Sequence, residues 1–475
     1  MEKRFHLKEH GTTVRTEVMA GITTFMAMAY ILMVNANMFA NPFGDGTDVL
    51  GVSYGAIYIA TALSAVVGTV LIGLLSNLPL AQASGMGLNA FFVYSVCVGM
   101  GFSYANALVM VLVDGIVFIL LTVTGLRKMI FEAIPKTVKT AISAGIGLFI
   151  AFLGLQNAGI IVNSDSTLVD LHSFNIAFND SVTWAQIMPL LVTIFAIIAI
   201  GAMSKRKVKG AVFWGILGAA AAYYILGFAT IGNFYADSVQ ASLNMNILQP
   251  FKDFFSMSVA KVFTDGLDYS AWIAANGMGS FIVTFLTTML AFCMVDMFDT
   301  LGTLYGACSA GNMLTPEGDV PNMEKAMLAD AIATCFGAVC GTSTVTTVVE
   351  SSAGVAEGGR TGLASMVTAG MFLIAMFLAP VAALIPSCAT AAALVYVGIL
   401  MIGGVRGIEW GDPAEAVPAF LTMAMMPFSY NISYGIAFGL ISYVFIKIFT
   451  GKIKEVNLGT WIITLLFTLM FFLSR

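Results

Sequence analysis

The sequence is poor in charged residues, which occupy only 10% of its 475 positions and leave a net charge of −5. Soluble proteins carry roughly 25% charged residues and are roughly 45–50% apolar, whereas this chain is 59% hydrophobic. That balance excludes a soluble globular protein. The basic residues occur in short clusters rather than in one long patch, so the sequence gives no support to nucleic-acid binding.

Cysteine is also scarce, and its spacing matches no disulfide or zinc-binding motif. The six cysteines form no CxxC pair and lie mostly in apolar stretches, where we interpret them as small buried hydrophobic residues. The pattern indicates neither a disulfide framework nor a zinc site, and we expect no metal and no cofactor. Residues 1–17 are too polar for the apolar core of a secretory signal, so we expect a cytoplasmic N-terminal segment without a cleaved leader.

Long apolar runs dominate the rest of the chain. A helix needs about 20 mostly apolar residues to span a bilayer, and fourteen runs approach this requirement. The first seven lie near 18–39, 54–75, 78–100, 103–125, 138–160, 184–203 and 211–232. The other seven lie near 275–304, 323–341, 343–356, 361–384, 387–404, 415–430 and 432–449. A last run, 461–473, is short for a fifteenth span, and a position along the membrane interface is the alternative.

The basic residues indicate how the spans are oriented. With a cytoplasmic N-terminus, 18 of the 21 Lys and Arg residues fall in cytoplasmic segments, as the positive-inside rule requires. Lys252 and Lys261 fall outside, and Arg475 is the last residue. The sequence therefore predicts a multi-pass protein of the cytoplasmic membrane with its N-terminus in the cytoplasm.

Seven spans in each half predict internal symmetry. An odd number of spans turns the second half upside down relative to the first, which is the inverted repeat of many secondary transporters. Ile134-Pro135 precedes Gly147 by the same step by which Ile385-Pro386 precedes Gly398, and this match supports the pairing of the halves. The predicted segments are an N-terminal segment 1–17, a first repeat 18–232, an extracytoplasmic loop 233–274, a second repeat 275–449 and a C-terminal segment 450–475.

Several acidic residues lie where the chain should cross the membrane. Insertion of a charged side chain at the centre of a span costs roughly 2.5–3.5 kcal/mol, so we expect each of these acids to have a structural or functional role. Asp296 and Asp299, in AFCMVDMFDTLGTLYG, share a helix face, and Thr303 lies one turn beyond. Glu350 lies in TSTVTTVVESSAGVAEGG. Because Asp299 and Glu350 have no Lys or Arg nearby in sequence, we predict that both belong to a functional site, with Asp296 as a supporting residue.

Two further acids leave alternatives open. Asp330 lies close to Lys325, so it either ends a span and faces water or joins the site. Asp114 stands alone in ALVMVLVDGIVFILL, and we interpret it as a helix-packing contact or a gate residue.

Two segments favour irregular backbone at membrane depth, which is tolerated only where it is buried in protein or lines a cavity. In residues 80–89, LAQASGMGLN, Gly85 and Gly87 weaken a helix in mid-span, although close helix packing alone would also explain GMG. In residues 341–354, GTSTVTTVVESSAG, the Thr and Val run favours extended structure. Both lie in the third span of their half, which predicts a binding site at the midplane.

The chemistry of these segments favours a planar heterocycle as ligand. Free backbone N–H and C=O groups beside Asp299 and Glu350 could pair with the ring nitrogens and carbonyls of such a molecule. Aromatic side chains would complete the slot by stacking, although simple packing is the alternative for each of them. The candidates are Tyr30, Phe92, Tyr94 and Phe298.

Five segments resemble the AzgA-like branch of the xanthine/uracil permease (nucleobase/ascorbate transporter) family, namely VDMFDTLGTLYG, LADAIATCFGAVCGTSTVTTVVESSAGVAEGGRTGL, ASGMGLNAFFVY, TTFMAMAYILMVN and AVPAFLTMAMMPFSYNISYGIAFGLISYVFIK. The resemblance covers nearly the whole chain. It implies an all-α membrane protein with about fourteen spans in a 7+7 inverted repeat, in which spans 3 and 10 are broken by short strands and the spans form a core and a gate domain. It also implies inward transport of hypoxanthine, guanine or adenine with protons, and a homodimer.

The resemblance assigns roles to particular residues. The acid of the FDT motif falls on Asp299, the acid of the ESSAG motif on Glu350, the Asn of GMGLNA on Asn89 and the acid of span 9 on Asp330. The predicted substrate-binding residues are Asp299, Glu350, Asn89, Thr303, Phe298 and Ser351. The predicted proton-coupling residues are Asp299, Glu350, Asp330 and Asp296.

Two positions depart from the family pattern. Ser84 stands where relatives usually carry Pro before GMG, and Asn35-Ala36 stands where they usually carry Asn-Pro. Either departure could shift the local backbone and the substrate preference. Neither removes an acid.

The resulting hypothesis is that Glu350 and Asp299 bind the edge of a purine and that one carboxyl group in the site carries the coupled proton. Xanthine or uracil as substrate and sodium as coupling ion are alternatives within the same family. An intramembrane aspartyl hydrolase would also use paired acids, but the chain lacks the YD and GxGD signatures. A passive channel has no need of an acid-lined site, and the acids would repel the substrate of a sulfate-type anion transporter. We therefore expect a transporter rather than an enzyme.

Overall fold

A computed structural model describes residues 2–44, 46–124, 134–164, 166–176, 182–234, 246–316 and 319–473. This part of the chain is mostly helical, and ten of its helices are long and apolar enough to cross a membrane. After the short α1 (Glu2–Phe5), the first seven spans are α2 (Val14–Met28) with α3 (Tyr30–Ala40), α4 (Tyr54–Leu75), β1 (Gln82–Ser84) with α5 (Met86–Ala90) and the π-helix η1 (Phe91–Gly99), α6 (Tyr104–Thr124), α8 (Lys136–Asn157), α9 (Trp184–Lys205) and α10 (Ala211–Thr230).

The second seven spans follow the same plan. They are α14 (Met278–Ala310), α15 (Met323–Cys340), β4 (Val345–Thr347) with η5 (Val349–Ser351) and α16 (Ser352–Ala356), α17 (Gly362–Ala375) with η6 (Met376–Leu378) and α18 (Ala379–Ala382), α19 (Ser387–Ile402) with η7 (Gly403–Gly407), α20 (Pro413–Ser429) and α21 (Ile432–Phe449). The ten long helices account for ten of the fourteen predicted spans. The two broken spans, α15 and α20 account for the other four, so all fourteen are found in the described residues.

The packing of the helices shows the inverted repeat. α4 packs against α17, and their repeat equivalents α15 and α6 pack against each other. In the same way α9 pairs with α10, and α20 pairs with α21. The equivalent helices α8 and α19 also pack together. At their contact a Cβ on Gly147 would lie 2.7 Å from the carbonyl oxygen of Gly398, and a Cβ on Gly398 would clash with the carbonyl oxygen of Gly147. The two helices therefore need glycine at both equivalent positions.

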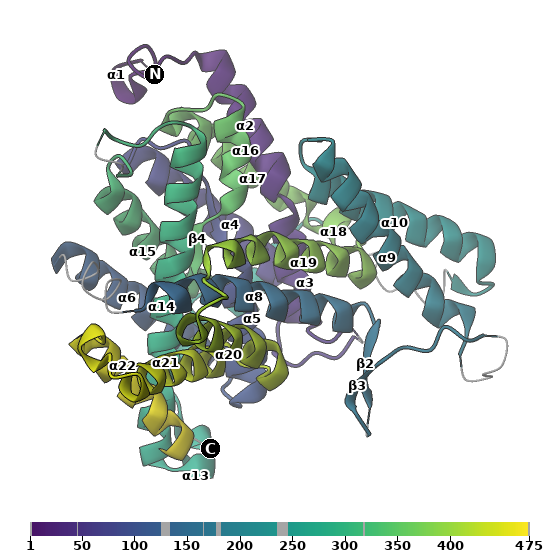
Figure 1. Cartoon of the computed structure of the whole chain (residues 1–475). Helices are drawn as coiled ribbons and strands as arrows, with labels where there is room; N and C mark the ends of the chain where they lie inside the picture. The colour runs from purple at the N-terminus through teal and green to yellow at the C-terminus, as the bar shows by residue number, and fades with distance from the viewer. Residues whose placement is uncertain are drawn as a thin grey trace.

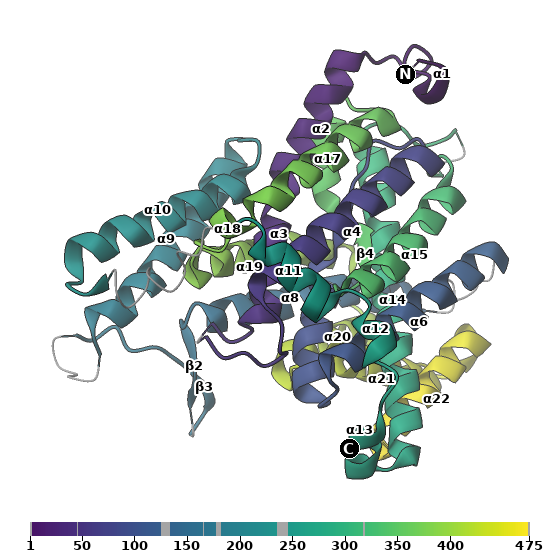
Figure 2. The ribbon, with the colours of Figure 1, turned by 180° about the vertical axis from the view of Figure 1, so that it is seen from behind.

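The spans form two groups that correspond to a core and a gate. α2–α6 and α14–α17 pack with one another around β1 and β4, whereas α8–α10 and α19–α21 form the second group. Figures 1 and 2 show α9 and α10 as a separate pair at one edge of the molecule, beside α18. The N-terminus and the C-terminus lie at opposite ends in both views.

The two broken spans meet at the centre of the core. β1 and β4 pair antiparallel, with Gln82 opposite Thr347 and Ser84 opposite Val345. Both strands are fully buried. Side chains bond the backbone groups that the ladder leaves over, since Thr69 accepts from the N–H of Gln82 and Asp330 accepts from the N–H of Thr347, as is necessary where no water is present. The β-branched residues of β4 favour this extended backbone. The predicted interruption of spans 3 and 10 by short strands is confirmed.

The connections hold structure that the sequence analysis did not predict. In the segment predicted as a loop at 233–274, the described residues form α11 (Gln249–Asp253), η4 (Phe254–Ser258), α12 (Lys261–Thr264) and α13 (Ser270–Asn276). α11 and η4 pack against α4. A hairpin of β2 (Ile161–Ser164) and β3 (Leu168–Leu171) follows α8. These elements are too short to give a periodic hydrophobic pattern of their own.

The short apolar run near the C-terminus forms a helix that packs along a span. After η8 (Ile453–Glu455) the chain turns back into α22 (Leu458–Leu473), which contacts α21 and α14. Near its end, Phe471 packs against Tyr434 and Phe438 at the start of α21, with ring centroids 5.5 and 5.3 Å apart. α22 therefore runs antiparallel to α21.

Candidate functional site

A cavity of about 540 Å³ lies where the broken spans of the core face α8 and α19. Its volume falls in the range of small-molecule sites, roughly 300–1,000 Å³. The lining residues are Tyr30, Ile31, Ser84, Gly85, Met86, Gly87, Ile142, Ser143, Ile146, Val295, Asp299, Gly302, Thr303, Val348, Val349, Glu350, Ser352, Val397, Leu400 and Met401. The cavity thus brings together the predicted residues Asp299, Thr303 and Glu350.

Glu350 is held at the cavity by a tyrosine from the first span. The residue lies in η5, which begins two residues after the end of β4, so the strand fixes its position. The hydroxyl of Tyr30 donates a hydrogen bond to Oε1 of Glu350. Tyr30 begins α3, just after the interruption at Ala29 that separates α2 from α3. Tyr30 lines the cavity, so its predicted stacking on a ligand stays a prediction, and the structure adds its contact with a carboxylate.

Asp299 lies on α14 beside the ends of both strands. The hydroxyl of Thr346 donates to its Oδ2 over 3.3 Å. A Cβ on Gly85 would lie 3.1 Å from that Thr346 oxygen and 3.4 Å from Oδ2 of Asp299, so a side chain there would crowd the carboxylate. Thr303 lies one helical turn further along and is buried. The two carboxylates and this hydroxyl therefore belong to one cavity although they come from spans 8 and 10.

Asp330 lies behind the strand pair and does not line the cavity. Its Oδ1 accepts hydrogen bonds from the backbone N–H of Thr347 over 3.0 Å and from the side-chain amide of Gln82 over 3.2 Å. Its Oδ2 accepts from the hydroxyl of Thr300 over 2.7 Å. Asp330 thereby joins β1, β4 and α14, which is a structural contact. Its predicted part in proton coupling remains a prediction.

Three of the other predicted residues, Ser351, Asn89 and Asp296, are not among the residues that line the cavity. The hydroxyl of Ser351 accepts from the N–H of Ala81 over 3.0 Å, and it also donates to the Ala81 carbonyl over 3.3 Å. Asn89 is fully buried in α5, and its side-chain amide has no hydrogen-bond partner among the described residues. Asp296 is fully buried on α14. The side chain of Phe298 lies outside the described part of the structure.

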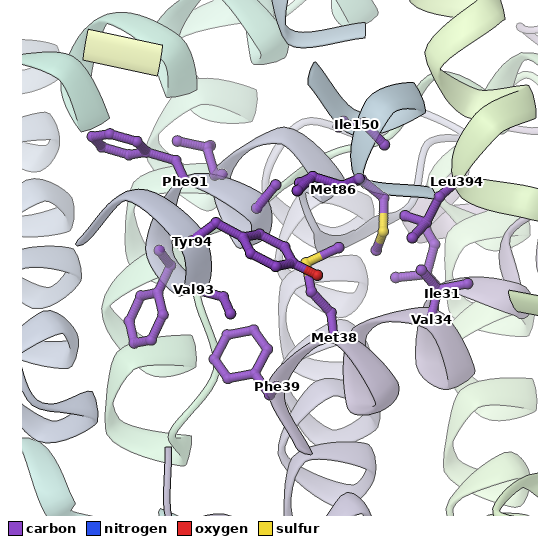
Figure 3. Packing of buried hydrophobic residues seen from close by; sticks show 14 of the residues in the cluster. Ile31, Val34, Met38, Phe39, Met86, Phe91, Val93, Tyr94, Ile150 and Leu394 are labelled. Carbon is purple, nitrogen blue, oxygen red and sulfur yellow. The ribbon is translucent and has the colours of Figure 1, made fainter. Parts of the chain in front are cut away.

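The remaining aromatic candidates pack in a closed layer rather than at the cavity. Tyr94 donates a hydrogen bond to the carbonyl of Pro42 over 2.6 Å. Phe92 packs against Phe39, with ring centroids 5.1 Å apart. Figure 3 shows this layer, in which Tyr94 lies near Met38 and Phe39. Simple packing, the alternative considered for these side chains, describes them better than stacking on a ligand.

The two departures from the family pattern meet at one hydroxyl group. The hydroxyls of Ser84 and Thr342 lie 2.9 Å apart, within hydrogen-bond distance. The amide of Asn35 donates to the same Thr342 oxygen over 3.0 Å and to the hydroxyl of Thr61 over 2.7 Å. Because Ser84 lines the cavity, this buried network connects the cavity wall to α3.

Two further acids have structural contacts. Glu17 is fully buried, and its carboxylate accepts from the backbone N–H groups of Arg360, Thr361 and Ala364 at the start of α17, over 2.8 to 3.3 Å. Glu17 belongs to the segment 1–17, for which the sequence predicts a cytoplasmic position, and its burial is therefore not predicted. The thiol of Cys293 donates to Oδ1 of Asp114 over 2.8 Å, which fits the helix-packing interpretation of Asp114.

The sequence of the chain matches the model of a permease family, that of the xanthine/uracil permeases, over residues 15–457. This chain belongs to the xanthine/uracil permease family. It is 39% identical to the guanine/hypoxanthine permease PbuG of Bacillus subtilis, over 96% of each chain. It is 36% identical to the adenine permease AdeP of Escherichia coli, over 99% of this chain and 95% of that protein.

The fold of this xanthine/uracil permease is also found in solved structures of low sequence identity. It is similar to the transmembrane domain of the cyanobacterial bicarbonate transporter BicA, with a TM-score of 0.59 and 16% identity over 89% of this chain and 97% of that one. It is similar to SLC26A9, with a TM-score of 0.59 and 12% identity over 92% of this chain and 66% of that one. These likenesses concern the fold of core and gate alone.

Membership of the family decides between a transporter and an enzyme. The permease is a multi-pass membrane transporter and not an enzyme, so the intramembrane aspartyl hydrolase is excluded. Among the described residues, no group of three His, Cys, Asp or Glu side chains is placed to hold a metal ion.

Proposed function

We propose that this permease carries the neutral purine nucleobases hypoxanthine, guanine or adenine into the cell together with protons. The observation that carries the proposal is the meeting of Asp299, Thr303 and Glu350 with the ends of β1 and β4 at one cavity. The names of the guanine/hypoxanthine and adenine permeases that the chain resembles support purines as substrates. Xanthine and uracil are the alternative substrates within the family.

The core and the gate offer different surfaces to a purine. From the core, the carboxylates of Asp299 and Glu350 can accept hydrogen bonds from ring N–H and amino groups, and Thr303 can donate or accept. From the gate, the side chains that line the cavity are almost entirely apolar, namely Ile142, Ile146, Val397, Leu400 and Met401, with Ser143 beside them. In this arrangement the polar edge of the base faces the core and its ring packs against the gate.

Proton coupling would use the same carboxylates. A carboxyl group in a closed, low-dielectric site can hold a proton that it loses in water, so Asp299 or Glu350 can take up a proton on one side and release it on the other. One proton moving through 100 mV provides about 2.3 kcal/mol, which supports roughly 50-fold accumulation of a neutral base. Asp296 and Asp330 are proposed to support this step from behind the cavity.

We further propose that access alternates by movement of the core against the gate around this site. The N-terminus is placed in the cytoplasm on the distribution of Lys and Arg. The proposed boundaries remain 1–17 for the N-terminal segment, 18–232 and 275–449 for the repeats, and 233–274 and 450–475 for the connecting and C-terminal segments. A homodimer is part of the proposal and rests on the family alone.

The test is uptake of radiolabelled hypoxanthine, guanine, adenine, xanthine and uracil by cells that express the wild type or Glu350→Gln. We expect one or more purines to accumulate, and both the substitution and a protonophore to stop the accumulation. The control is Glu409→Gln, which neutralises an exposed carboxylate and should leave uptake intact. Normal uptake by Glu350→Gln would overturn the assigned site, and uptake that follows sodium instead of the proton gradient would overturn the coupling.

A further inference from the structure

A second cavity, of about 570 Å³, lies at the other end of α8. It is lined by Phe43, Gln156, Asn157, Gly159, Ile161, Val162, Asn163 and Tyr430. We call it the vestibule. The β2–β3 hairpin, which supplies three of these residues, lies on the side of the molecule away from the N-terminus in Figures 1 and 2. With the proposed orientation the vestibule therefore faces the cell exterior.

The vestibule and the acid-lined cavity follow one another along α8. Ile146 lines the inner cavity and Gln156 lines the vestibule, so the two are about 15 Å apart at the 1.5 Å rise per residue of a helix. Between them Tyr430 packs against Phe149 and Tyr94, with ring centroids 5.8 and 6.2 Å away. This aromatic layer separates the two cavities. A solute entering from the vestibule would have to pass it to reach Glu350.

The vestibule is uncharged in its described lining, and its polar groups can both donate and accept hydrogen bonds. Its polar groups are the side-chain amides of Gln156, Asn157 and Asn163 and the hydroxyl of Tyr430, and none of the described residues that line it is charged. An amide both donates and accepts, so it can pair with a ring nitrogen beside an N–H or carbonyl group. Phe43 and Tyr430 add aromatic surface for stacking. The vestibule fits a neutral, planar nitrogen heterocycle better than an ion, which would find no opposite charge there.

The floor of the vestibule is built from both domains. Tyr430 lies between α20 and α21 of the gate in the left-handed conformation, with φ of 55°. Its hydroxyl donates to the side-chain oxygen of Gln156, and its carbonyl accepts from the hydroxyl of Ser95 in the core over 3.0 Å. The amide of Asn157 on the gate donates to the hydroxyl of Tyr94 on the core over 3.3 Å. Movement of the core against the gate must break the bonds from Ser95 to Tyr430 and from Asn157 to Tyr94, because these two cross between the domains, and their loss would open the floor.

We infer that the vestibule is a second binding site for the transported base, at which the base is held by amide groups before the aromatic floor opens. The inference rests on the proposed function for the identity of the ligand, because a purine has the flat ring and the adjacent donors and acceptors that the amides match. It adds a site at the far end of α8 that shares no lining residue with the acid-lined cavity.

The test measures whether an added base occupies the vestibule. Asn163→Cys places a thiol on the exposed side of β2 at the vestibule, where a membrane-impermeant maleimide added from outside can label it. The purine that the wild type takes up best, among hypoxanthine, guanine and adenine, is then added. At ten times its dissociation constant the base should slow labelling roughly tenfold. Ser166→Cys, on the same hairpin but outside the vestibule, should be labelled at an unchanged rate.

The same measurement in a Glu350→Gln background separates this inference from the proposed function. Because that substitution disables the inner site, protection that persists there must arise in the vestibule. Adding Gln156→Leu, which removes one amide, should raise the dissociation constant for the protecting base about five- to tenfold, the effect of losing roughly one hydrogen bond. Equal labelling of Asn163→Cys with and without base would overturn the inference while leaving the inner site untouched. Protection together with normal uptake by Glu350→Gln would support the vestibule and overturn the inner site.

Discussion

The two halves of this permease have the same fold but bring different chemistry to the cavity. The second half contributes two carboxylates, Asp299 and Glu350, and places Asp330 behind them. The first half contributes the neutral side chains of Tyr30 and Ser84 with the glycines of the GMG segment. The difference teaches that the repeat supplies a symmetrical frame, whereas the carboxylates that line the cavity come from one half alone.

The asymmetry has a physical reason. If both halves carried acids at equivalent positions, four carboxylates would share one cavity, and the cost of burying each charge would be increased by their mutual repulsion. The first-half acids Glu17 and Asp114 are instead held by backbone N–H groups of α17 and by the thiol of Cys293, away from the cavity. The following predictions test this division, from the largest expected effect to the smallest.

The largest effect is expected at Asp330, an acid of the second half that contacts the strands of both halves. Asp330→Ala removes the acceptor for Thr347, Gln82 and Thr300, and each buried donor left without a partner costs about 1–3 kcal/mol. We expect a large fall in the melting temperature of the purified protein in detergent. Gln82→Ala, on the first-half strand, should cost much less, and equal melting temperatures for the two variants would refute the division.

A first-half residue should act on transport through a second-half acid. Tyr30→Phe removes the hydroxyl that orients Glu350. A hydrogen bond to a charged group contributes about 1.5–3 kcal/mol, so KM for the purine should rise about tenfold or more. Tyr58→Phe is the matched control, because its hydroxyl is also buried but donates to the carbonyl of Ala375 over 3.1 Å. If both variants keep the wild-type KM, Tyr30 does not position Glu350.

The buried acid of the first half should matter for stability and not for binding. Glu17→Gln replaces one carboxylate oxygen by an N–H₂ group at the start of α17, where backbone N–H groups and the helix dipole favour negative charge. We expect a loss of about 1 kcal/mol, seen as a lower melting temperature. KM for the purine should be unchanged, and a raised KM with an unchanged melting temperature would place Glu17 in transport instead.

The smallest effect concerns an acid of the C-terminal segment, Glu455, which is paired with a lysine of the second half outside the cavity. Lys447 donates to Oε2 of Glu455 over 2.8 Å and holds the pKa of this exposed carboxyl below its ordinary value. The contribution to stability is therefore complete above the ordinary pKa of about 4.3 and is lost as the pH falls through the lowered value. Melting curves of the wild type between about pH 3 and 7 should show a small acid-side loss that Glu455→Gln lacks.

Much of the frame could be predicted from the sequence. The apolar runs predict the spans, because a bilayer requires each of them to be long and continuous. The glycines of LAQASGMGLN and the Thr and Val residues of GTSTVTTVVESSAG predict the interruptions of spans 3 and 10, because local backbone preference decides them. Asp299 and Glu350 could be selected because an acid without a nearby base is unusual at membrane depth.

The contacts between distant residues could not be predicted in the same way. The bond from Tyr30 to Glu350 joins residues 320 positions apart, and Glu17 reaches the start of α17 across 343 positions. Which of these side chains meet depends on how the two repeats pack together. The position of Asp330 behind β4, and not at the cavity, has the same cause, since its partners come from three separate elements.

The antiparallel pair of β1 and β4 also sets an order of events during synthesis. Gln82 lies opposite Thr347, 265 positions further along the chain. At roughly 5–20 residues per second, β1 leaves the ribosome between about a quarter of a minute and one minute before its partner. During that interval a strand at membrane depth has no ladder to complete its hydrogen bonds. The first repeat therefore cannot mature alone, and assembly of the acid-lined cavity must wait until the second repeat has entered the membrane.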